Sequence, residues 1–464
     1  MAIANVAGCK GKSSASVKRT RIAPAVEYVP APAARGSAGA AEPTATTGPA
    51  APVGTLAVPG VRRPEVEPNN DSKTANVVAL ESVVTGELKD PTDVDLFAVV
   101  IEKPSDLTVL LASAGDVVVE LRDGTGSVVA KSDRGGNAVT EGLPNFAVVK
   151  GRYLVAVTSF RKAEPVGKKK SKSPTSATLG SAGSAAPVVA ASLRYEVQLA
   201  ATAQAPRSGI ELEPNLDAGT ANDLFIGEAA TGYVGWTGDV DVWKLSVEGL
   251  AARNALDIEL SAVDGVTPTL TVSDAVGRPV LQRQGAKSRL LSIRNVVPVV
   301  GTNVPPYYFL TISGERSNPL AMYRLNVVAR VLSGADEIEP NDTGATAQLL
   351  QIGQNLTANW QIGDTDSFVI AADTTSRRLT IVITPTQGAD LIGDVLIPNQ
   401  PLIEFNHRGQ GGSETVDVDL PAGIQAIVRV QGNAKRKAVE GAYAISVDVA
   451  QGVSDPMPNE QRAP

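Results

Sequence analysis

The 464-residue sequence predicts an all-β protein in which three tandem antiparallel β-sandwich domains, jelly-roll-like in type, follow a disordered N-terminal tether. One long motif recurs three times in the same order, short segments of alternating apolar and polar residues follow each copy, and turn-forming residues separate those segments. Alternation with a period of two is typical of half-buried strands, and many short strands in series are typical of a β-sandwich. The repeat predicts domains at 61–205, 206–333 and 334–451, with a disordered tail at 452–464.

Residues 1–60 differ from the rest of the chain in composition, because beyond the first ten residues they are rich in Ala, Pro, Gly, Ser and Thr. Such a segment cannot bury enough apolar surface to offset the entropy of ordering, so we expect a flexible tether. It holds six basic and two acidic residues, a net charge of +4, which leaves −11 for the remainder. Its early Lys and Arg residues fit a position against anionic lipid headgroups.

The only cysteine, Cys9, ends the tetrapeptide Val6-Ala7-Gly8-Cys9. An aliphatic residue, two small residues and a cysteine resemble the lipobox of bacterial lipoproteins. The resemblance implies acylation of Cys9, a signal peptide, export across the inner membrane and an anchor at the outer membrane or cell surface. The residues before Cys9 are too few for a full secretory signal. Either the start of the protein lies upstream, or Cys9 is an unpaired thiol in the tether.

The composition disfavours several functional classes. One His and one Cys cannot build a His/Cys zinc site, a Cys–His dyad or a disulfide. A net charge of −7 argues against nucleic-acid binding, and no apolar run reaches the length of a membrane-spanning helix. The lone histidine, His407, lies in a Gly-rich segment with no evident titrating partner, which favours a surface turn over catalysis. We therefore predict no catalytic residues and no enzyme.

Each copy of the repeat contains two motifs in the same order. Its copies begin at Glu65, Glu211 and Glu337, and each reads Glu-x-Glu-Pro-Asn. An Asp-x-Asp pair follows, with its second Asp at Asp95, Asp241 and Asp366. Between the two motifs stand Gly86, Gly232 and Ala358, and two residues after each pair stand Phe97, Trp243 and Phe368. These motifs and the small residue between them recur three times in one order at matching spacing, which does not arise by chance, so each copy is one structural unit.

Each copy continues with segments that predict strands. Hairpin turns are predicted at 123–126 and 274–277, with a looser counterpart near 395–405. Each copy closes with two strands, and the last begins with Tyr195, Tyr323 or Tyr443. Copy one carries an insertion containing Lys168-Lys169-Lys170-Ser171-Lys172, which we expect to be a solvated loop. Contact of this basic cluster with an acidic surface is the alternative.

The succession of Glu-x-Glu-Pro-Asn, a glycine, Asp-x-Asp with an aromatic residue, and a final Tyr-led strand resembles the bacterial pre-peptidase C-terminal domain. This family is a small calcium-associated β-sandwich that occurs beside secreted peptidases and is related to clostridial collagen-binding modules. The resemblance covers about 63–202, 209–332 and 335–450. Copy three departs from it at Ala358, Phe405-Asn406 and Ile424. No protease domain is evident, so peptidase activity is not implied.

The acidic motifs suggest a cation site in each copy. The second Asp is in phase with a core-facing aromatic residue, so it points toward semi-buried space, where an unpaired carboxylate is costly. Calcium prefers six to eight oxygen ligands. The candidate ligands are Glu65, Glu67, Asn69, Asn70, Asp71, Asp93 and Asp95 in copy one; Glu211, Glu213, Asn215, Asp217, Asp239 and Asp241 in copy two; and Glu337, Glu339, Asn341, Asp342, Asp364 and Asp366 in copy three. The alternative is that these residues only cap strands and accept backbone hydrogen bonds.

The expected function is non-catalytic. The leading hypothesis is a secreted or surface lipoprotein whose modules, stiffened by calcium, bind an extracellular polymer or an envelope protein. One alternative is a structural stalk or assembly subunit of the cell envelope, and another is an accessory protein to a secreted peptidase. Trp236, Trp360 and Tyr233 lie near the Asp pairs and would suit an aromatic binding platform, although core packing is the favoured interpretation.

Overall fold

The computed structural model describes residues 56, 61–160, 192–204, 209–299, 301, 303–386, 388–433 and 439–450. We call the described residues of 61–204 module 1, those of 209–333 module 2 and those of 334–450 module 3. Cys9 and the Lys168–Lys172 cluster lie outside the described residues. Within the described part, no helix is long and apolar enough to cross a membrane.

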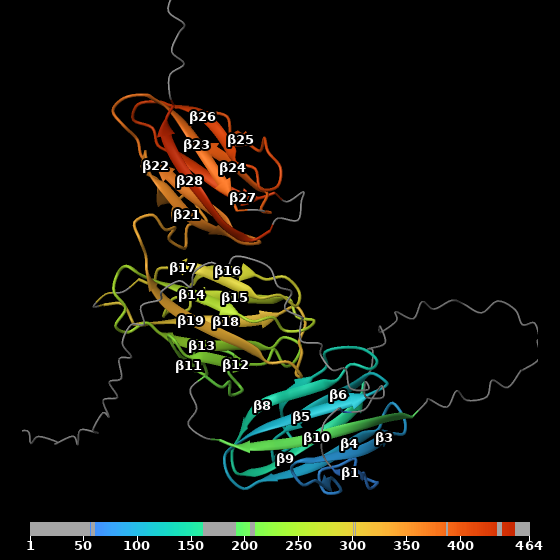
Figure 1. The fold of residues 1–464 in the computed structure, drawn as a ribbon. Helices are drawn as coiled ribbons and strands as arrows, with labels where there is room; N and C mark the ends of the chain where they lie inside the picture. The colour runs from blue at the N-terminus through green and yellow to red at the C-terminus, as the bar shows by residue number, and fades with distance from the viewer. Residues whose placement is uncertain are drawn as a thin grey trace, which may run out of the picture. The chain divides into compact units, whose positions relative to one another are not determined.

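The described chain is all-β, as predicted, and it contains no helix (Figure 1). Module 1 comprises β1 (Val61–Pro64), β2 (Asn76–Val77), β3 (Ser82–Leu88), β4 (Val94–Ile101), β5 (Ser105–Ser113), β6 (Val117–Arg122), β7 (Val128–Ser132), β8 (Glu141–Val148), β9 (Gly151–Ser159) and β10 (Leu193–Ala203). Module 2 comprises β11 (Asn222–Phe225), β12 (Ala229–Gly232), β13 (Val240–Ser246), β14 (Asn254–Leu260), β15 (Pro268–Ser273), β16 (Pro279–Gln284), β17 (Leu291–Val296), β18 (Tyr307–Gly314) and β19 (Tyr323–Val331). Module 3 comprises β20 (Gln348–Leu349), β21 (Asn355–Trp360), β22 (Thr365–Ile370), β23 (Arg377–Pro385), β24 (Leu391–Leu396), β25 (Ile403–Phe405), β26 (Glu414–Leu420), β27 (Ala426–Gly432) and β28 (Gly441–Val449).

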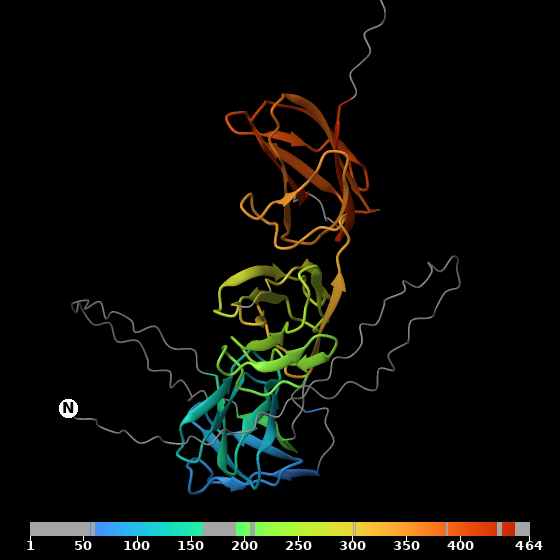
Figure 2. The ribbon, with the colours of Figure 1, turned by 90° about the vertical axis from the view of Figure 1, so that its left-hand side faces the viewer.

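Each module consists of two sheets. In module 1 the strand orders are β1-β3-β10-β5-β8 and β2-β4-β9-β6-β7. Module 2 has β12-β19-β14-β17 and β11-β13-β18-β15-β16, and module 3 has β21-β28-β23-β26 and β20-β22-β27-β24-β25. The two closing strands of each copy, such as β9 and β10, therefore lie in opposite sheets (Figures 1 and 2). This arrangement places the start of the last strand across the core from the Asp-x-Asp strand.

The sheets are not purely antiparallel, which corrects the predicted strand arrangement. The pairs β1–β3, β2–β4, β11–β13 and β20–β22 are parallel. In module 1, the segment 65–75 leaves β1 at the edge of one sheet and enters β2 at the edge of the other. The chain crosses between the sheets before it reaches the strand that pairs with each edge strand. Such a connection allows the paired strands to run in the same direction, whereas a short hairpin would make them antiparallel. The crossover segment begins with the Glu-x-Glu-Pro-Asn motif.

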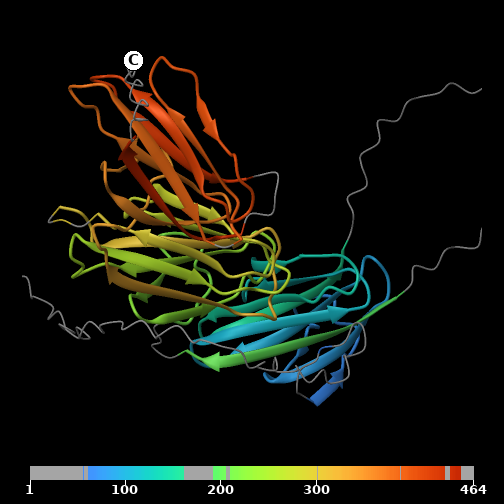
Figure 3. The same cartoon turned by 45° about the horizontal axis from the view of Figure 1, so that its top comes forward.

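Figure 3 shows the strands of the three modules as ribbons, and the main hydrophobic core of each module lies between its two sheets. Phe97, Trp243 and Phe368 are fully buried in the three cores, as their phase within the strands predicts. Strand interiors alternate in burial; in β22, for example, Phe368 and Ile370 are buried on the core face. Side chains two residues apart point to the same face of a strand, so the second Asp of each pair points toward the core.

Among the strands that the sequence analysis did not predict are β8, β17 and β26, which lie later in each copy than the unpredicted strands before the Asp pair. In β8 and β17 the register shifts by one residue against the neighbouring strand, which is a β-bulge. Asn145 and Asn295 sit at these bulges with φ of 52° and 60°, a left-handed conformation that asparagine tolerates. The bulge interrupts the alternation of apolar residues that sequence reading relies on. Strand β26 pairs with β23 in continuous register and has no bulge.

Candidate metal centres

The Glu-x-Glu-Pro-Asn segment is held between the two sheets by backbone hydrogen bonds. In module 1 the Glu65 amide donates to the Thr85 carbonyl (2.9 Å), and the Asn69 carbonyl accepts from the Leu96 amide (3.0 Å). The corresponding bonds recur in modules 2 and 3, from Glu211 and Glu337 to the carbonyls of Thr231 and Thr357. The Glu-Pro peptide bond is cis in all three copies. The motif thus brings its two glutamates beside the strand that carries the Asp pair.

Three carboxylates meet in each module. Both glutamates of the first motif and the second Asp of the pair offer oxygens that lie within 4.8 Å of one another. These groups are Glu65, Glu67 and Asp95; Glu211, Glu213 and Asp241; and Glu337, Glu339 and Asp366. We call them the inner carboxylate groups of modules 1, 2 and 3. Three negative charges at this separation repel one another unless protons or a cation intervene.

The inner groups of modules 2 and 3 are buried; in module 1 Asp95 is buried, and Glu65 and Glu67 are partly exposed. Some of their oxygens have no hydrogen-bond donor. Asp95, Asp241 and Asp366 are at most 1% exposed. Among the atoms of these clusters, Asp95 Oδ1, Asp366 Oδ1 and Glu213 Oε1 are buried without a hydrogen-bond partner. The motif asparagines Asn69, Asn215 and Asn341 are fully buried, and the side-chain Oδ1 of each also lacks a donor. Buried acceptors normally find a donor, so oxygens left without one fit a bound cation.

A tyrosine hydroxyl borders each inner group, a feature that the sequence analysis did not assign to the site. The Tyr195 hydroxyl donates to Asp95 Oδ2 (2.6 Å) and lies 2.9 Å from Glu65 Oε2. Tyr443 donates to Asp366 Oδ2 (2.6 Å), and Tyr323 donates to Glu211 Oε1 (3.2 Å). The available signal was that each last strand begins with Tyr. A single hydroxyl proton satisfies only one oxygen of the group.

The residue that pairs with each tyrosine across the sheet is small, which leaves space for the tyrosine side chain. Gly86 pairs with Tyr195, Gly232 with Tyr323 and Ala358 with Tyr443. A Cβ on Gly86 would collide with the Tyr195 hydroxyl and would come within 2.8 Å of Glu65 Oε2. The glycine therefore makes room for the tyrosine–glutamate contact. In module 3, where Ala358 occupies the position, Glu337 accepts from the Asn341 side chain (3.0 Å) and the Asn359 amide (2.9 Å), as Glu65 accepts from the Asn69 side chain (3.2 Å) and the Glu87 amide (2.6 Å) in module 1.

Burial raises the pKa values of the buried carboxyl groups in these clusters. The pKa of Asp95 is raised to about 8, first by desolvation and then by the neighbouring charges of Glu65, Asp93 and Glu67, although the Tyr195 hydroxyl lowers it. Desolvation raises the pKa of Glu211 to about 8 and that of Glu213 to about 9. It also raises the pKa of Asp366 well above its usual range. Without a cation, the buried carboxyls Asp95, Glu211, Glu213 and Asp366 therefore favour their protonated form at neutral pH.

The remaining predicted ligands lie at different distances from the inner groups. Asp93 accepts from the Asn70 side chain (2.8 Å) and the Lys89 amide (2.8 Å), which places both Asp93 and Asn70 at the margin of the cluster. Asp239 is buried beside the inner group of module 2. Asp71 and Asp217 are exposed and accept the backbone amides of the turn that follows, so neither belongs to a carboxylate group. Their role is that of turn caps.

Module 3 holds a second carboxylate group, formed by Glu339, Asp342 and Asp364, whose oxygens also lie within 4.8 Å of one another. We call it the outer carboxylate group. Arg283 of module 2 contacts all three members: its Nη2 lies 3.2 Å from Glu339 Oε1 and 2.9 Å from Asp342 Oδ1, and it also bonds Asp364. The Arg283 side chain is only 4% exposed. The sequence pattern gave no indication of this arginine.

Other candidate residues lie away from the acidic groups or serve packing. The His407 side chain is 64% exposed, on a turn where its backbone amide donates to Glu414. Trp360 is buried in the core of module 3, as the packing interpretation predicts. Trp236 packs against the core of module 1, and Tyr233 is partly buried. These positions do not form an exposed aromatic platform.

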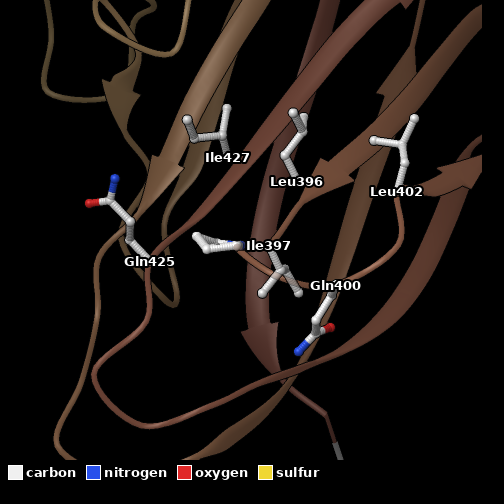
Figure 4. Close-up of a pocket in the computed structure, with 7 residues that line it drawn as sticks. Leu396, Ile397, Gln400, Leu402, Gln425 and Ile427 are labelled. Atoms are coloured by element: carbon white, nitrogen blue, oxygen red, sulfur yellow. The ribbon is translucent and has the colours of Figure 1, made fainter.

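Module 3 also has an apolar surface hollow of ≈350 Å³ (Figure 4). Leu396, Ile397, Leu402 and Ile427 supply its apolar lining, and Gln400 and Gln425 supply polar groups. Leu402 is 48% exposed. No group in the lining titrates near neutral pH, so the hollow offers surface for contact and no acid–base chemistry.

Comparisons with known proteins found no matching family model and no matching curated protein. Solved structures to which the chain is similar include the pre-peptidase C-terminal domain of collagenase from Bacillus anthracis, at 12% identity over 28% of this chain and 99% of that one, with a TM-score of 0.19. Another is the N-terminal CBM22-1-CBM22-2 tandem domain of Paenibacillus barcinonensis Xyn10C, at 12% identity over 45% and 82%, with a TM-score of 0.15. A third is the CUB1-EGF-CUB2 domain of human MASP-1/3, at 5% identity over 47% and 99%, with a TM-score of 0.16. At these scores the similarities carry no part of the argument.

Proposed function

We propose that this protein is a non-catalytic, calcium-binding protein of the cell envelope, built from three β-sandwich modules that resemble pre-peptidase C-terminal domains and that bind an extracellular polymer or protein. The observation that carries the proposal is the inner carboxylate group. The same carboxylate cluster recurs in three modules of one chain, buried in modules 2 and 3 and partly buried in module 1, with the same backbone support and with oxygens that lack donors. A repeated, costly arrangement of this kind is retained for a purpose other than packing.

The donor set suits calcium. Carboxylate, amide and hydroxyl oxygens predominate around the clusters, and hard oxygen ligands select calcium or magnesium over softer metals. Two cationic side chains also reach inner-group members: Lys89 pairs with Glu67 in module 1, and Arg283 pairs with Glu339 in module 3. In module 1 the residues that would hold the ion are Glu65, Glu67, Asn69 and Asp95. The ion would neutralise the carboxylates and fix the motif segment between the two sheets. Calcium sites in extracellular modules bind at about 10⁻⁴–10⁻³ M.

The proposed location and partner rest on other parts of the chain. Acylation at Cys9 would anchor the tether in a membrane, and two or more acyl chains give stable attachment. The modules would then stand outside the membrane, where calcium is plentiful. The apolar hollow of module 3, with Leu402 exposed, is a surface on which a polymer or protein would dock.

A structural stalk or assembly subunit is the second candidate, and one observation favours it. The motif segments of modules 2 and 3 form backbone hydrogen bonds with the preceding module: the Ala147 amide donates to the Glu213 carbonyl (2.7 Å), and the Val297 amide donates to the Glu339 carbonyl (3.0 Å). Joints bonded through the backbone suit a protein that sets a fixed spacing. In this case the ligand-binding step would be absent.

One experiment separates the two candidates. The full-length protein is used to capture partners from envelope extract in calcium and in chelator, with the Asp95→Asn, Asp241→Asn, Asp366→Asn triple variant as the control. A partner retained in calcium, and lost with chelator and with the variant, is the expected result. Recovery of no partner under either condition would support the stalk and overturn the binding function.

The anchor is tested separately. Cells that express the protein are grown with labelled palmitate, and the full-length chain is expected to take up label. Cys9→Ser should take up none. Equal labelling of the two proteins, or none in either, would contradict acylation at Cys9.

A further inference from the structure

The two joints between modules use the same backbone contact. Each bulged strand, β8 or β17, receives the second motif glutamate of the next module. The Glu213 amide donates to the carbonyl of Asn145 (3.1 Å), and the Glu339 amide donates to that of Asn295 (3.0 Å). The bulge places these asparagine carbonyls outside the ladder of their own sheet, free to pair. Each joint therefore includes a residue of an inner carboxylate group.

The two joints differ in charge. At the joint between modules 2 and 3, the Arg283 guanidinium enters the outer carboxylate group and contacts Glu339, Asp342 and Asp364. The Arg283 counterpart in module 1 is Ser132, since each lies nine residues after the hairpin aspartate, Asp123 or Asp274. Ser132 donates its hydroxyl to Glu141 of its own module. No cationic side chain makes an ion pair with the inner group of module 2 among the described residues.

The carboxylate that pairs with Arg283 is also absent from the joint between modules 1 and 2. Asp342 directly follows the motif asparagine in module 3, and Leu216 takes this position in module 2, where it is 50% exposed. Arg283 thus meets Asp342 at one joint, while Ser132 accompanies Leu216 at the other. The repeat contains an internal comparison: an arginine–carboxylate pair is present in one joint, and both of its members are replaced by uncharged residues in the other.

We propose that Arg283 is a built-in cation, whose guanidinium takes the outer carboxylate group of module 3 and holds the joint between modules 2 and 3 without bound metal. At the joint between modules 1 and 2, Arg134 of module 1 donates to Ser317 of module 2 but, within the described part of the chain, forms no ion pair with a carboxylate group of module 2. The inner group of module 2 therefore depends on a bound ion, a part of the inference that rests on the proposed function. A divalent ion and a guanidinium beside the same carboxylates would repel each other. Arg283 therefore excludes metal from the outer group. Because Glu339 belongs to both groups and pairs with Arg283, an ion at the inner group of module 3 would be held mainly by Glu337 and Asp366.

The arginine is suited to this task. A guanidinium is always charged and presents several donors in a fixed plane, so it can bond three carboxylates at once. Removing one partner from a buried ion pair leaves uncompensated charge in the interior. Loss of Arg283 would leave Glu339 and Asp364, both nearly fully buried, without a cation at the point where the two modules meet.

The test measures the rigidity of each joint in the full chain. Spin labels are attached at exposed positions in a Cys9→Ser background, with the pair Val100→Cys and Val276→Cys across modules 1 and 2, and the pair Val276→Cys and Leu402→Cys across modules 2 and 3. Pulsed electron spin resonance gives the distribution of distances within each pair. In chelator, we expect the first distribution to broaden and the second to remain narrow. Calcium should narrow the first.

The variants then isolate the arginine. Arg283→Gln should broaden the second distribution in chelator, whereas Arg278→Gln, on the same hairpin and 79% exposed in its side chain, should leave it narrow. The double variant Arg283→Ser, Asp342→Leu places in the second joint the residue types found at the first. Its distance distribution across modules 2 and 3 should be broad in chelator and become narrow only when calcium is added. Circular dichroism shows that each variant is folded. If Arg283→Gln does not fold, Arg283→Lys, which keeps the positive charge, is measured instead. In chelator, its distance distribution across modules 2 and 3 should be narrower than that of the double variant.

Two results would overturn the proposal: a second distribution that broadens in chelator in the unsubstituted protein, or one that Arg283→Gln leaves narrow. The comparison of Arg283→Gln with the unsubstituted protein uses no calcium. A protein in which calcium changes neither joint would therefore contradict the proposed calcium function while leaving the role of Arg283 to be judged on its own.

Discussion

Replacing Asp95 with asparagine should remove the calcium response of module 1 while changing the calcium-free protein little. Asp95 lies at the centre of the inner group, with Oδ2 bonded to Tyr195 and Oδ1 without a donor. Because burial raises its pKa to about 8, the calcium-free protein holds a neutral carboxyl there at pH 7. Asparagine has the same shape and is also neutral. It lacks the negative charge that a bound ion requires.

The expected magnitude follows from mass action. An ion that binds only the folded state at about 10⁻⁴–10⁻³ M stabilises it, at about 10 mM calcium, by about 1.4–2.7 kcal/mol. For a domain of this size, this corresponds to a rise in melting temperature of about 4–12 °C. In the Asp95→Asn protein the transition of module 1 should no longer move, and those of modules 2 and 3 should still rise.

Differential scanning calorimetry of the full chain, in calcium and in chelator, measures these shifts. Glu102→Gln is the matched control, because the Glu102 side chain is 78% exposed in the same module and its one ion pair is distant, at 3.9 Å. The reasoning would be refuted if calcium left every transition unmoved, or if Asp95→Asn responded to calcium as the unsubstituted protein does.

Three further predictions concern the inner groups. In chelator the melting temperature should fall as pH rises from about 5 to 8. The reason is that folded carboxyls with pKa values raised to about 8, such as Asp95 and Glu211, keep protons that the unfolded chain loses near pH 4. Calcium should reduce or reverse this dependence of the melting temperature on pH, since it binds the deprotonated carboxylates. A pH titration of the melting temperature checks this, and a rising slope in chelator would contradict it. Tyr195→Phe removes the hydroxyl donor of Asp95 and should cost about 1–3 kcal/mol in calcium-free chemical denaturation, so an unchanged midpoint would count against the contact. Gly86→Ala should cost about 1–3 kcal/mol by crowding Tyr195 and should weaken calcium binding in calorimetric titration, whereas Ala358→Gly, at the equivalent position of module 3, should leave binding intact.

The sequence allowed the all-β class and the burial of the aspartates to be predicted, because both follow from short-range periodicity. Phe97 is buried, so a carboxylate two residues earlier on the same strand faces the same way. The pattern did not reveal β8, β17 or β26, since in the first two a bulge breaks the alternation at Asn145 and Asn295. The parallel edge strands were also missed, because strand direction at an edge depends on a crossover that local sequence does not encode.

The candidate sites, too, could be predicted only in part from the sequence. The motif glutamates and the second aspartates come together as in-phase positions suggest, yet Asp71 and Asp217 cap turns, a use that aspartate serves equally well. The tyrosines join the site through cross-strand pairing with Gly86 and its counterparts, which only the sheet order reveals. Arg283 reaches a carboxylate 81 residues away in sequence, in another module, and no local pattern marks such a contact.

The central claim is that each inner carboxylate group holds a calcium ion. Crystals of the protein grown in calcium, with the ions located from anomalous scattering, test it most directly. The account predicts one ion in each module, bonded to the Oδ1 atoms of Asp95 and Asp366 and to the carboxylates of Glu211, Glu213 and Asp241, and no ion at the outer group that Arg283 fills. Inner groups that hold only water or protons at saturating calcium would contradict it.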